Sequence, residues 1–274
     1  MRTNNILAFG ITAMMLLSSG CNDHPAANAK NVPVEIRYPD KGDFRVFYPL
    51  FRDRHVNNVI NAVRQSGIVQ EKLDWLNSSF NLPRDIIILF KESDTLNAFY
   101  NPVKKNIEFH SAFVYDFYKK LSAFYQEPEL SEHVMNVVIF FLFHEMGHAL
   151  IDQYQLPVKG PEEDEADCFA VFLLTHGDEK AERALIDCAN VFYQYGKEYE
   201  NMPVANLDPL LWDEHSLDKK RFYNLLALLY GKDPNKHRYL ISEGVLPYAL
   251  TPRFVQDYKK IMNGWQRDLD PYLK

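Results

Sequence analysis

Residues 137–150 read VVIFFLFHEMGHAL, seven consecutive apolar residues followed by an H-E-x-x-H motif. The spacing of apolar residues predicts a helix over residues 131–154, and the apolar run indicates that this helix is buried on nearly all sides. Residues four apart share one face of a helix, so His144 and His148 can present two imidazoles to one cation, with Glu145 beside a metal-bound water. The motif therefore predicts a zinc-hydrolase site on a core helix. The alternative is a pair of core histidines with Glu145 as their ion partner, which leaves the carboxylate beside the pair unexplained.

A third ligand is expected in the acidic stretch that follows. A catalytic zinc needs three protein ligands and an open position, and residues 161–167 read PEEDEAD at the start of a helix predicted over residues 161–175. A hairpin would fold this turn back over the two histidines. Glu163 and Asp167 lie four apart on a face that continues into apolar residues, so we expect Glu163 to bind the metal and Asp167 to accept the outer N–H of a ligating histidine. The other acids fit a solvated helix start at the positive end of the helix dipole: Glu162, Asp164 and Glu165.

The rest of the chain predicts strands first and helices afterwards. Strand-like runs occupy residues 34–38, 44–48 and 86–90, and a turn at Asn101 and Pro102 indicates a hairpin between residues 97–100 and 106–109. One helix is predicted among the early strands, over residues 55–76. Beyond Ser111 the periodicity predicts helices over residues 112–125, 131–154, 161–175, 179–199, 216–230 and 252–268. This order indicates an α+β fold, and we expect residues 34–274 to form a single domain.

Composition limits the class of protein. The 274 residues include 30 Lys and Arg against 37 Asp and Glu, a net charge of −7, and 47% of them are hydrophobic. The apolar content is sufficient for a buried core, and the acidic balance argues against nucleic-acid binding, which needs a basic surface. An oxidising compartment would favour a disulfide between Cys168 and Cys188, whereas the usual spacing of packed helices exceeds disulfide reach. Both states of the two thiols stay open.

The N-terminus predicts export. An apolar run over residues 6–17 follows Arg2, and as a helix it would rise only about 18 Å, short of the ~30 Å hydrocarbon core of a membrane. We therefore interpret residues 1–20 as a signal peptide. Small residues lead into Cys21, which resembles the lipidated cysteine of bacterial lipoproteins, and residues 21–33 are polar, as expected of a flexible linker. The alternative is an ordinary signal peptide with an incidental cysteine. Either interpretation predicts an exported protein, in the periplasm or cell envelope.

Two levels of resemblance extend this interpretation. The H-E-x-x-H motif followed by E-x-x-A-D at residues 163–167 resembles the gluzincin metallopeptidases, in which the glutamate is the third zinc ligand. Five blocks resemble more closely a bacterial family of uncharacterised function, known only as putative metallopeptidases: NAFYNP (97–102), HEMGHALID (144–152), PEEDEADCFAVFLL (161–174), HSLDKKRFYN (215–224) and LYGKDP (229–234). His110 and Ala227 stand where that family often has cysteines. The resemblance implies a zincin-like fold, with a small mixed sheet followed by a mainly helical C-terminal part.

The resemblance also implies a mechanism. The hairpin strand would border a cleft above the metal, with an extended peptide added along its edge. Zinc would polarise the scissile carbonyl, and Glu145 would take a proton from the bound water and pass it to the leaving amine. His215 is our candidate to stabilise the oxyanion, because an imidazole can donate a hydrogen bond. Arg221 and Tyr223 are further candidates; the ordinary alternatives for the three are a neighbour of a helix cap, a surface cation and a core tyrosine.

One function is favoured over two others. The leading hypothesis is a secreted or lipid-anchored zinc metallopeptidase that acts on a peptide or protein substrate and contacts the membrane through its N-terminal anchor. The alternative is a noncatalytic lipoprotein that binds a partner or a cell-wall component, but a structural zinc site needs no adjacent base such as Glu145. A hydrolase of nonpeptide amides would use the same residues.

Overall fold

The computed structural model describes residues 38–176, 179–200 and 218–274. The described residues all belong to one compact unit, which spans Ile36–Lys274. The predicted signal peptide, Cys21 and the linker lie outside the described residues, as does His215. The strand predicted over residues 34–38 also lies outside them, except for Tyr38, which is not in a strand.

A mixed sheet of four strands lies on the N-terminal side of this unit. The strands are β1 (Phe44–Phe47), β2 (Ile86–Lys91), β3 (Ala98–Asn101) and β4 (Asn106–His110), in the spatial order β1-β2-β4-β3. β1, β2 and β4 are parallel, with Phe44 opposite Ile86 and Ile88 opposite Ile107. β3 pairs antiparallel with β4, as expected of the hairpin, and forms one edge of the sheet. Buried and half-buried residues alternate along β2, so one face of the sheet packs on the core.

Two helices are present where the sequence predicts one over residues 55–76. α1 (Arg54–Ser66) and α2 (Ile68–Ser79) are separated by Gly67, whose φ is 68°. Glycine adopts this left-handed conformation without steric cost, and it ends the first helix. The prediction of one continuous helix is wrong because apolar residues recur at helical spacing on both sides of the glycine.

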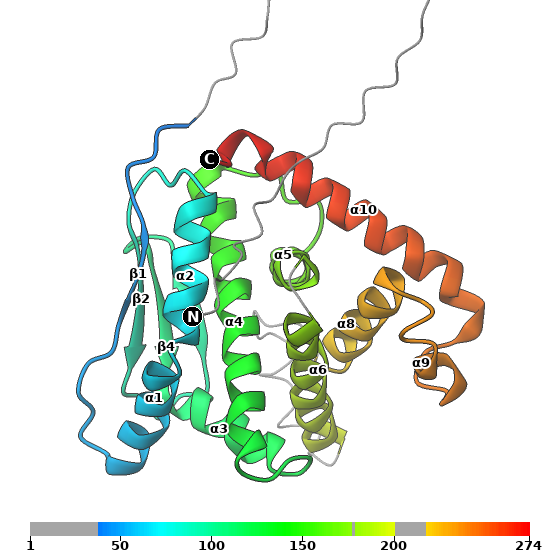
Figure 1. Ribbon diagram of the computed structural model, residues 1–274, viewed down its shortest axis with the longest axis horizontal. Helices are drawn as coiled ribbons and strands as arrows, with labels where there is room; N and C mark the ends of the chain where they lie inside the picture. Colours follow the sequence, from blue (N-terminus) through cyan, green and yellow to red (C-terminus); the bar gives the residue numbers. More distant parts are fainter. Residues whose placement is uncertain (1–37, 177–178, 201–217) are drawn as a thin grey trace, which may run out of the picture. The chain divides into compact units, whose positions relative to one another are not determined.

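The remainder of the unit is mainly helical. Its helices are α3 (Ser111–Leu121), α4 (Glu129–Tyr154), α5 (Glu162–Thr175), α6 (Glu179–Glu200), α8 (Asp218–Lys232), α9 (Tyr239–Ser242) and α10 (Thr251–Leu269), with 3₁₀ turns at Tyr248–Leu250 and Asp270–Tyr272. A small sheet followed by helices confirms the α+β fold class. α4 is central: it contacts α3, α5 and α6 as well as β3 and β4 (Figure 1).

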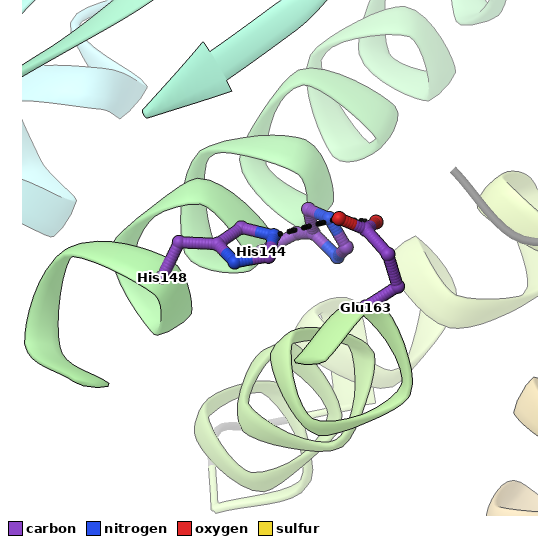
Figure 2. Close-up of side chains that lie close together, drawn as sticks. All are labelled: His144, His148 and Glu163. Carbon is purple, nitrogen blue, oxygen red and sulfur yellow. Dashed lines mark ion pairs between the residues drawn. The ribbon is translucent and has the colours of Figure 1, made fainter. Parts of the chain in front are cut away.

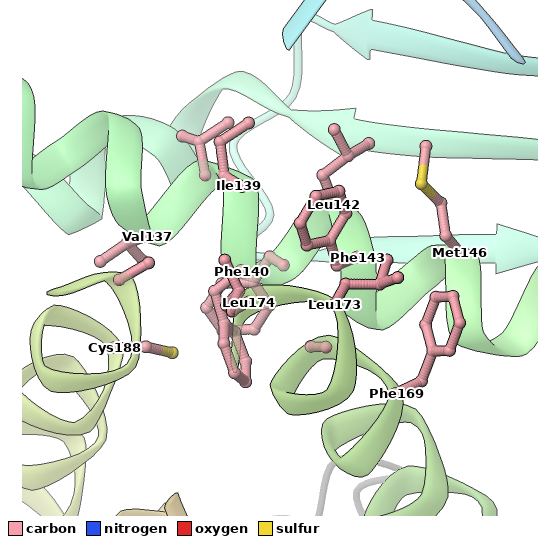
Figure 3. Close-up of a cluster of buried hydrophobic side chains, with 14 of the residues drawn as sticks. Val137, Ile139, Phe140, Leu142, Phe143, Met146, Phe169, Leu173, Leu174 and Cys188 are labelled. Carbon is pink, nitrogen blue, oxygen red and sulfur yellow. The ribbon is translucent and has the colours of Figure 1, made fainter. Parts of the chain in front are cut away.

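The middle of α4 lies in the core of the unit. All residues from Val137 to Gly147 are buried. Side chains such as Phe140 point towards α5, whereas those of Ile139, Leu142 and Met146 point towards the strands (Figure 3). By length and hydropathy α4 could cross a membrane, but 89% of its most apolar 18-residue window is buried within the unit, as expected of a core helix. Cys168 and Cys188 are both free, which is the alternative without a disulfide.

α4 and α5 approach each other closely at Gly147. A β-carbon added to Gly147 would lie 3.0 Å from Cα of Ala166 and 3.3 Å from Cβ of Phe169. The two small residues therefore permit a distance between the helices that a larger side chain would prevent. This close crossing places the acidic first turn of α5 next to His144 and His148.

Candidate metal centre

Three potential ligands meet where α4 passes the first turn of α5. His144 and His148 lie one turn apart on α4, and Glu163 faces them from α5 (Figure 2). Each oxygen of the Glu163 carboxylate lies 3.2 Å from Nε2 of one of the two histidines. One donor atom from each residue lies within 4.8 Å of the other two, a spacing that suits one metal ion. The structure thus brings together the three residues that the sequence proposes as ligands.

A carboxylate lies within hydrogen-bond distance of Nδ1 of each histidine. Nδ1 of His144 lies 2.8 Å from Oδ1 of Asp167, and Nδ1 of His148 lies 2.8 Å from Oε1 of Glu162. A carboxylate at Nδ1 favours the tautomer with its proton there, which leaves the lone pair of Nε2 for a metal. Asp167 lies where the sequence analysis expects it. Glu162 is half-exposed, as a solvated helix start would be, yet it also accepts this hydrogen bond.

Arg221 is a buried part of the site rather than a surface cation. Its exposed fraction is 1%, and it donates to both oxygens of Asp167, from Nε at 2.9 Å and from Nη2 at 2.6 Å. Burial raises the pKa of the Asp167 carboxyl, but the charge of Arg221 and the contact with His144 outweigh this effect and lower the pKa to about 2. The expectation of a surface cation is therefore wrong, and the guanidinium is engaged by Asp167.

Glu145 lies inside the site. Its side chain is 1% exposed, and its Oε1 is 4.0 Å from Nε2 of His144. The negative charge of the site is evident at His148: burial lowers the pKa of the imidazole, but the hydrogen bond with Glu163 and the charges of Glu145 and Glu163 raise it to about 9. A site that attracts a proton in this way also attracts a divalent cation, because both interact with the same carboxylates.

The structure assigns no role to the other two oxyanion candidates, Tyr223 and His215. Tyr223 is 43% exposed and its ring lies edge-on to that of Phe222, so it is not the core tyrosine of the ordinary alternative. His215 lies outside the described residues, and its role stays a prediction.

The sequence analysis missed the roles of Glu162 and Arg221. Glu162 belongs to a run of four acids, and the chain turn between α4 and α5 decides which of them meets His148. For Arg221 a signal was present, because helical spacing places it on the same face as Leu225 and Leu228, and all three are buried. A cation at the first position of an apolar helix face indicates a buried ion pair.

Two imidazoles and a carboxylate around one point, with a buried glutamate beside them, define a metal site of the hydrolase class. The chain belongs to the family described as "Putative metallopeptidase", whose model matches residues 48–269. No curated protein and no solved structure matches the chain. Family membership and the His-His-Glu cluster together indicate a peptidase that uses a metal ion.

Proposed function

We propose that the protein is a secreted or lipid-anchored zinc metallopeptidase that hydrolyses peptide bonds with Glu145 as the general base. The catalytic part of the proposal rests on one observation: Nε2 of His144, Nε2 of His148 and the carboxylate of Glu163 converge beside the buried Glu145. Imidazole nitrogen and carboxylate oxygen are common zinc ligands, and a set of three is typical of catalytic sites, which keep a position open.

Each residue of the cluster has a distinct role in this mechanism. His144, His148 and Glu163 would hold the zinc, which would act as a Lewis acid and lower the pKa of a bound water. Glu145 lies next to the ligand atoms and takes a proton from the attacking water, then passes it to the leaving amine. Asp167 and Glu162 keep the two imidazoles turned so that Nε2 faces the metal. His215 remains our candidate to stabilise the oxyanion.

A peptide substrate fits the edge of the sheet. β3 forms this edge, and it packs against α4, the helix that carries both histidines. An extended peptide can add to an edge strand through main-chain hydrogen bonds, while the side chains of the peptide provide specificity. We therefore infer that the substrate lies along β3, with its scissile bond beside the cluster of His144, His148 and Glu163.

Metal analysis and a hydrolysis assay test the catalytic proposal. The purified wild type is expected to contain about one zinc per chain by mass spectrometry, and Glu163→Ala is expected to lose most of it. Glu145→Gln should keep the zinc but cleave a protein substrate at least about 100-fold more slowly, because it removes the general base. Full activity in Glu145→Gln would overturn the mechanism. Bound zinc without cleavage of any protein or peptide would favour the noncatalytic lipoprotein.

Export and anchoring have a separate test. They are supported by the apolar segment over residues 6–17 and by the small residues before Cys21. In a bacterial host the wild type is expected in the membrane fraction, and Cys21→Ala, which cannot be lipidated, in the soluble periplasmic extract. Identical fractionation of the two forms would contradict the lipid anchor, and retention of both in the cytoplasm would contradict export.

A further inference from the structure

The metal centre is connected to a helix that carries none of the three ligands. α8 contributes Arg221, which reaches Asp167 on α5 across 54 residues of sequence. Oδ2 of Asp167 accepts a hydrogen bond from Nε of Arg221. Oδ1 accepts hydrogen bonds from both Nη2 of Arg221 and Nδ1 of His144. The two nitrogens that share Oδ1 lie 3.4 Å apart, so the guanidinium and the imidazole meet at the same oxygen.

We propose that Arg221 is a positioning residue of the metal centre. The two parallel hydrogen bonds fix the plane of the Asp167 carboxylate, and this plane determines the direction from which Oδ1 receives Nδ1–H of His144. Since the imidazole is rigid, that direction also determines where Nε2 points. Arg221 thus orients the ligand His144 through Asp167 and is not itself a metal ligand. This inference rests on the proposed function, because it requires His144 to bind the metal.

Aromatic rings keep the guanidinium in place. It lies 4.2 Å from the centre of the Phe192 ring and 5.7 Å from that of Phe141, both within the range of cation–π attraction. The Phe141 ring also lies 6.2 Å from the ring of His144. With Arg221 1% exposed, water has little access to replace its bonds to Asp167. The guanidinium, the carboxylate and the imidazole therefore have little freedom to rotate independently.

The competing explanation is that the ion pair only joins α5 to α8. A suitable control is available elsewhere in the chain: the carboxylate of Asp187 is fully buried, accepts Nδ1 of His133 at 2.8 Å and lies 3.5 Å from Nε of Arg183. His133 does not belong to the group of possible metal ligands that the described residues contain, which is His144, His148 and Glu163. Loss of the Asp187 cluster should therefore affect folding and leave the metal centre intact.

The experiment compares Arg221→Lys and Arg221→Met with Asp187→Asn. Lysine keeps the charge but cannot make two parallel hydrogen bonds, and methionine removes the charge at similar length. Zinc affinity is measured by competition with a chromophoric chelator, coordination geometry by the visible spectrum of the cobalt-substituted protein, and stability by thermal unfolding of the metal-free protein. We expect both Arg221 variants to bind zinc about 10- to 100-fold more weakly and to show an altered cobalt spectrum. Asp187→Asn should unfold at a lower temperature with unchanged zinc affinity and an unchanged spectrum.

Each outcome has a defined meaning. Unchanged zinc affinity and an unchanged cobalt spectrum in the Arg221 variants, with only their stability reduced, would overturn the positioning role. If Arg221→Met does not fold, Arg221→Lys alone decides, because it leaves no uncompensated charge beside Asp167. A wild type that takes up neither zinc nor cobalt would refute the proposed function and this inference together, whereas a metal-binding wild type with unaffected Arg221 variants refutes the inference alone.

Discussion

α4 carries two histidines in nearly the same setting, and only one of them belongs to the metal site. His133 and His144 lie eleven residues apart, and each has its Nδ1 2.8 Å from the carboxylate of a buried aspartate, Asp187 and Asp167 respectively. An arginine lies beside each of these aspartates. A histidine of α4 with an aspartate and an arginine from neighbouring helices therefore occurs twice.

The two clusters differ in what surrounds them. Asp187 also accepts hydrogen bonds from Tyr125 Oη at 3.1 Å and from Asn136 Nδ2 at 2.8 Å. The ring of His133 stacks on that of Tyr125, with 3.5 Å between the ring centres. Nε2 of His144 instead faces Glu163. A buried aspartate thus orients an imidazole in both places, and at His144 the carboxylate of Glu163 beside Nε2 adds a possible metal ligand.

The largest contrast is expected between His144→Ala and His133→Ala. Removal of a ligand should weaken zinc binding by more than the roughly 10- to 100-fold that loss of an outer hydrogen bond costs. His133→Ala should retain the metal, since its ring contacts Tyr125 and Asp187. Zinc content after dialysis measures both. Loss of zinc from His133→Ala with the fold intact would mean that the two clusters are not functionally distinct.

The next contrast concerns stability. Asp187→Asn would turn an amide nitrogen towards donors that now share a carboxylate, so we expect the free energy of unfolding to fall by about 3 kcal/mol. Urea denaturation of the metal-free protein measures this change. A much smaller effect would show that water replaces the lost hydrogen bonds, in spite of the complete burial of Asp187.

The same comparison shows how far the sequence could predict the site. His144 and His148 lie four residues apart, and so do Glu163 and Asp167. Residues at this spacing share one face of a helix, so the local pattern was sufficient to propose both pairs. Helical spacing indicates that Arg221 is buried, but local pattern does not identify its partner, because Asp167 lies 54 residues away and the contact depends on how α8 packs on α5. The sequence therefore predicts the candidate ligands, but it does not predict that Arg221 holds Asp167.

The fold was predictable to a similar depth. The hairpin and the helical C-terminal part follow from turn residues and apolar periodicity, and the structure has both. The break at Gly67 was missed because periodicity reports which face is buried and gives little information on a single backbone dihedral angle. The order of the strands, with β4 between β2 and β3, was not deduced, because it depends on the crossover connections.

A smaller effect is expected where the helices cross. Gly147→Ala adds a methyl group 3.0 Å from Cα of Ala166, and the resulting strain should exceed the about 1 kcal/mol that alanine gains in a helix. We expect a net loss of about 1 kcal/mol of stability and weaker zinc binding, because α5 carries Glu163. Gly160→Ala is the matched control, since no atom lies within 4 Å of its added β-carbon. Equal behaviour of the two variants would show that the crossing tolerates a wider separation.

The smallest effect is expected at Glu162, the exposed counterpart of Asp167. Its hydrogen bond to His148 is as short as that of Asp167 to His144, but its side chain is 51% exposed, so solvent screens the interaction and can replace it. Glu162→Ala should weaken zinc binding by no more than about fivefold, the equivalent of about 1 kcal/mol. Glu165→Ala, one turn further along α5, removes the same charge without a hydrogen bond to a ligand and separates the two contributions. If Glu162→Ala weakens zinc binding as much as Arg221→Lys does, burial is not what makes the Asp167 side effective, and the contrast between buried and exposed carboxylates fails.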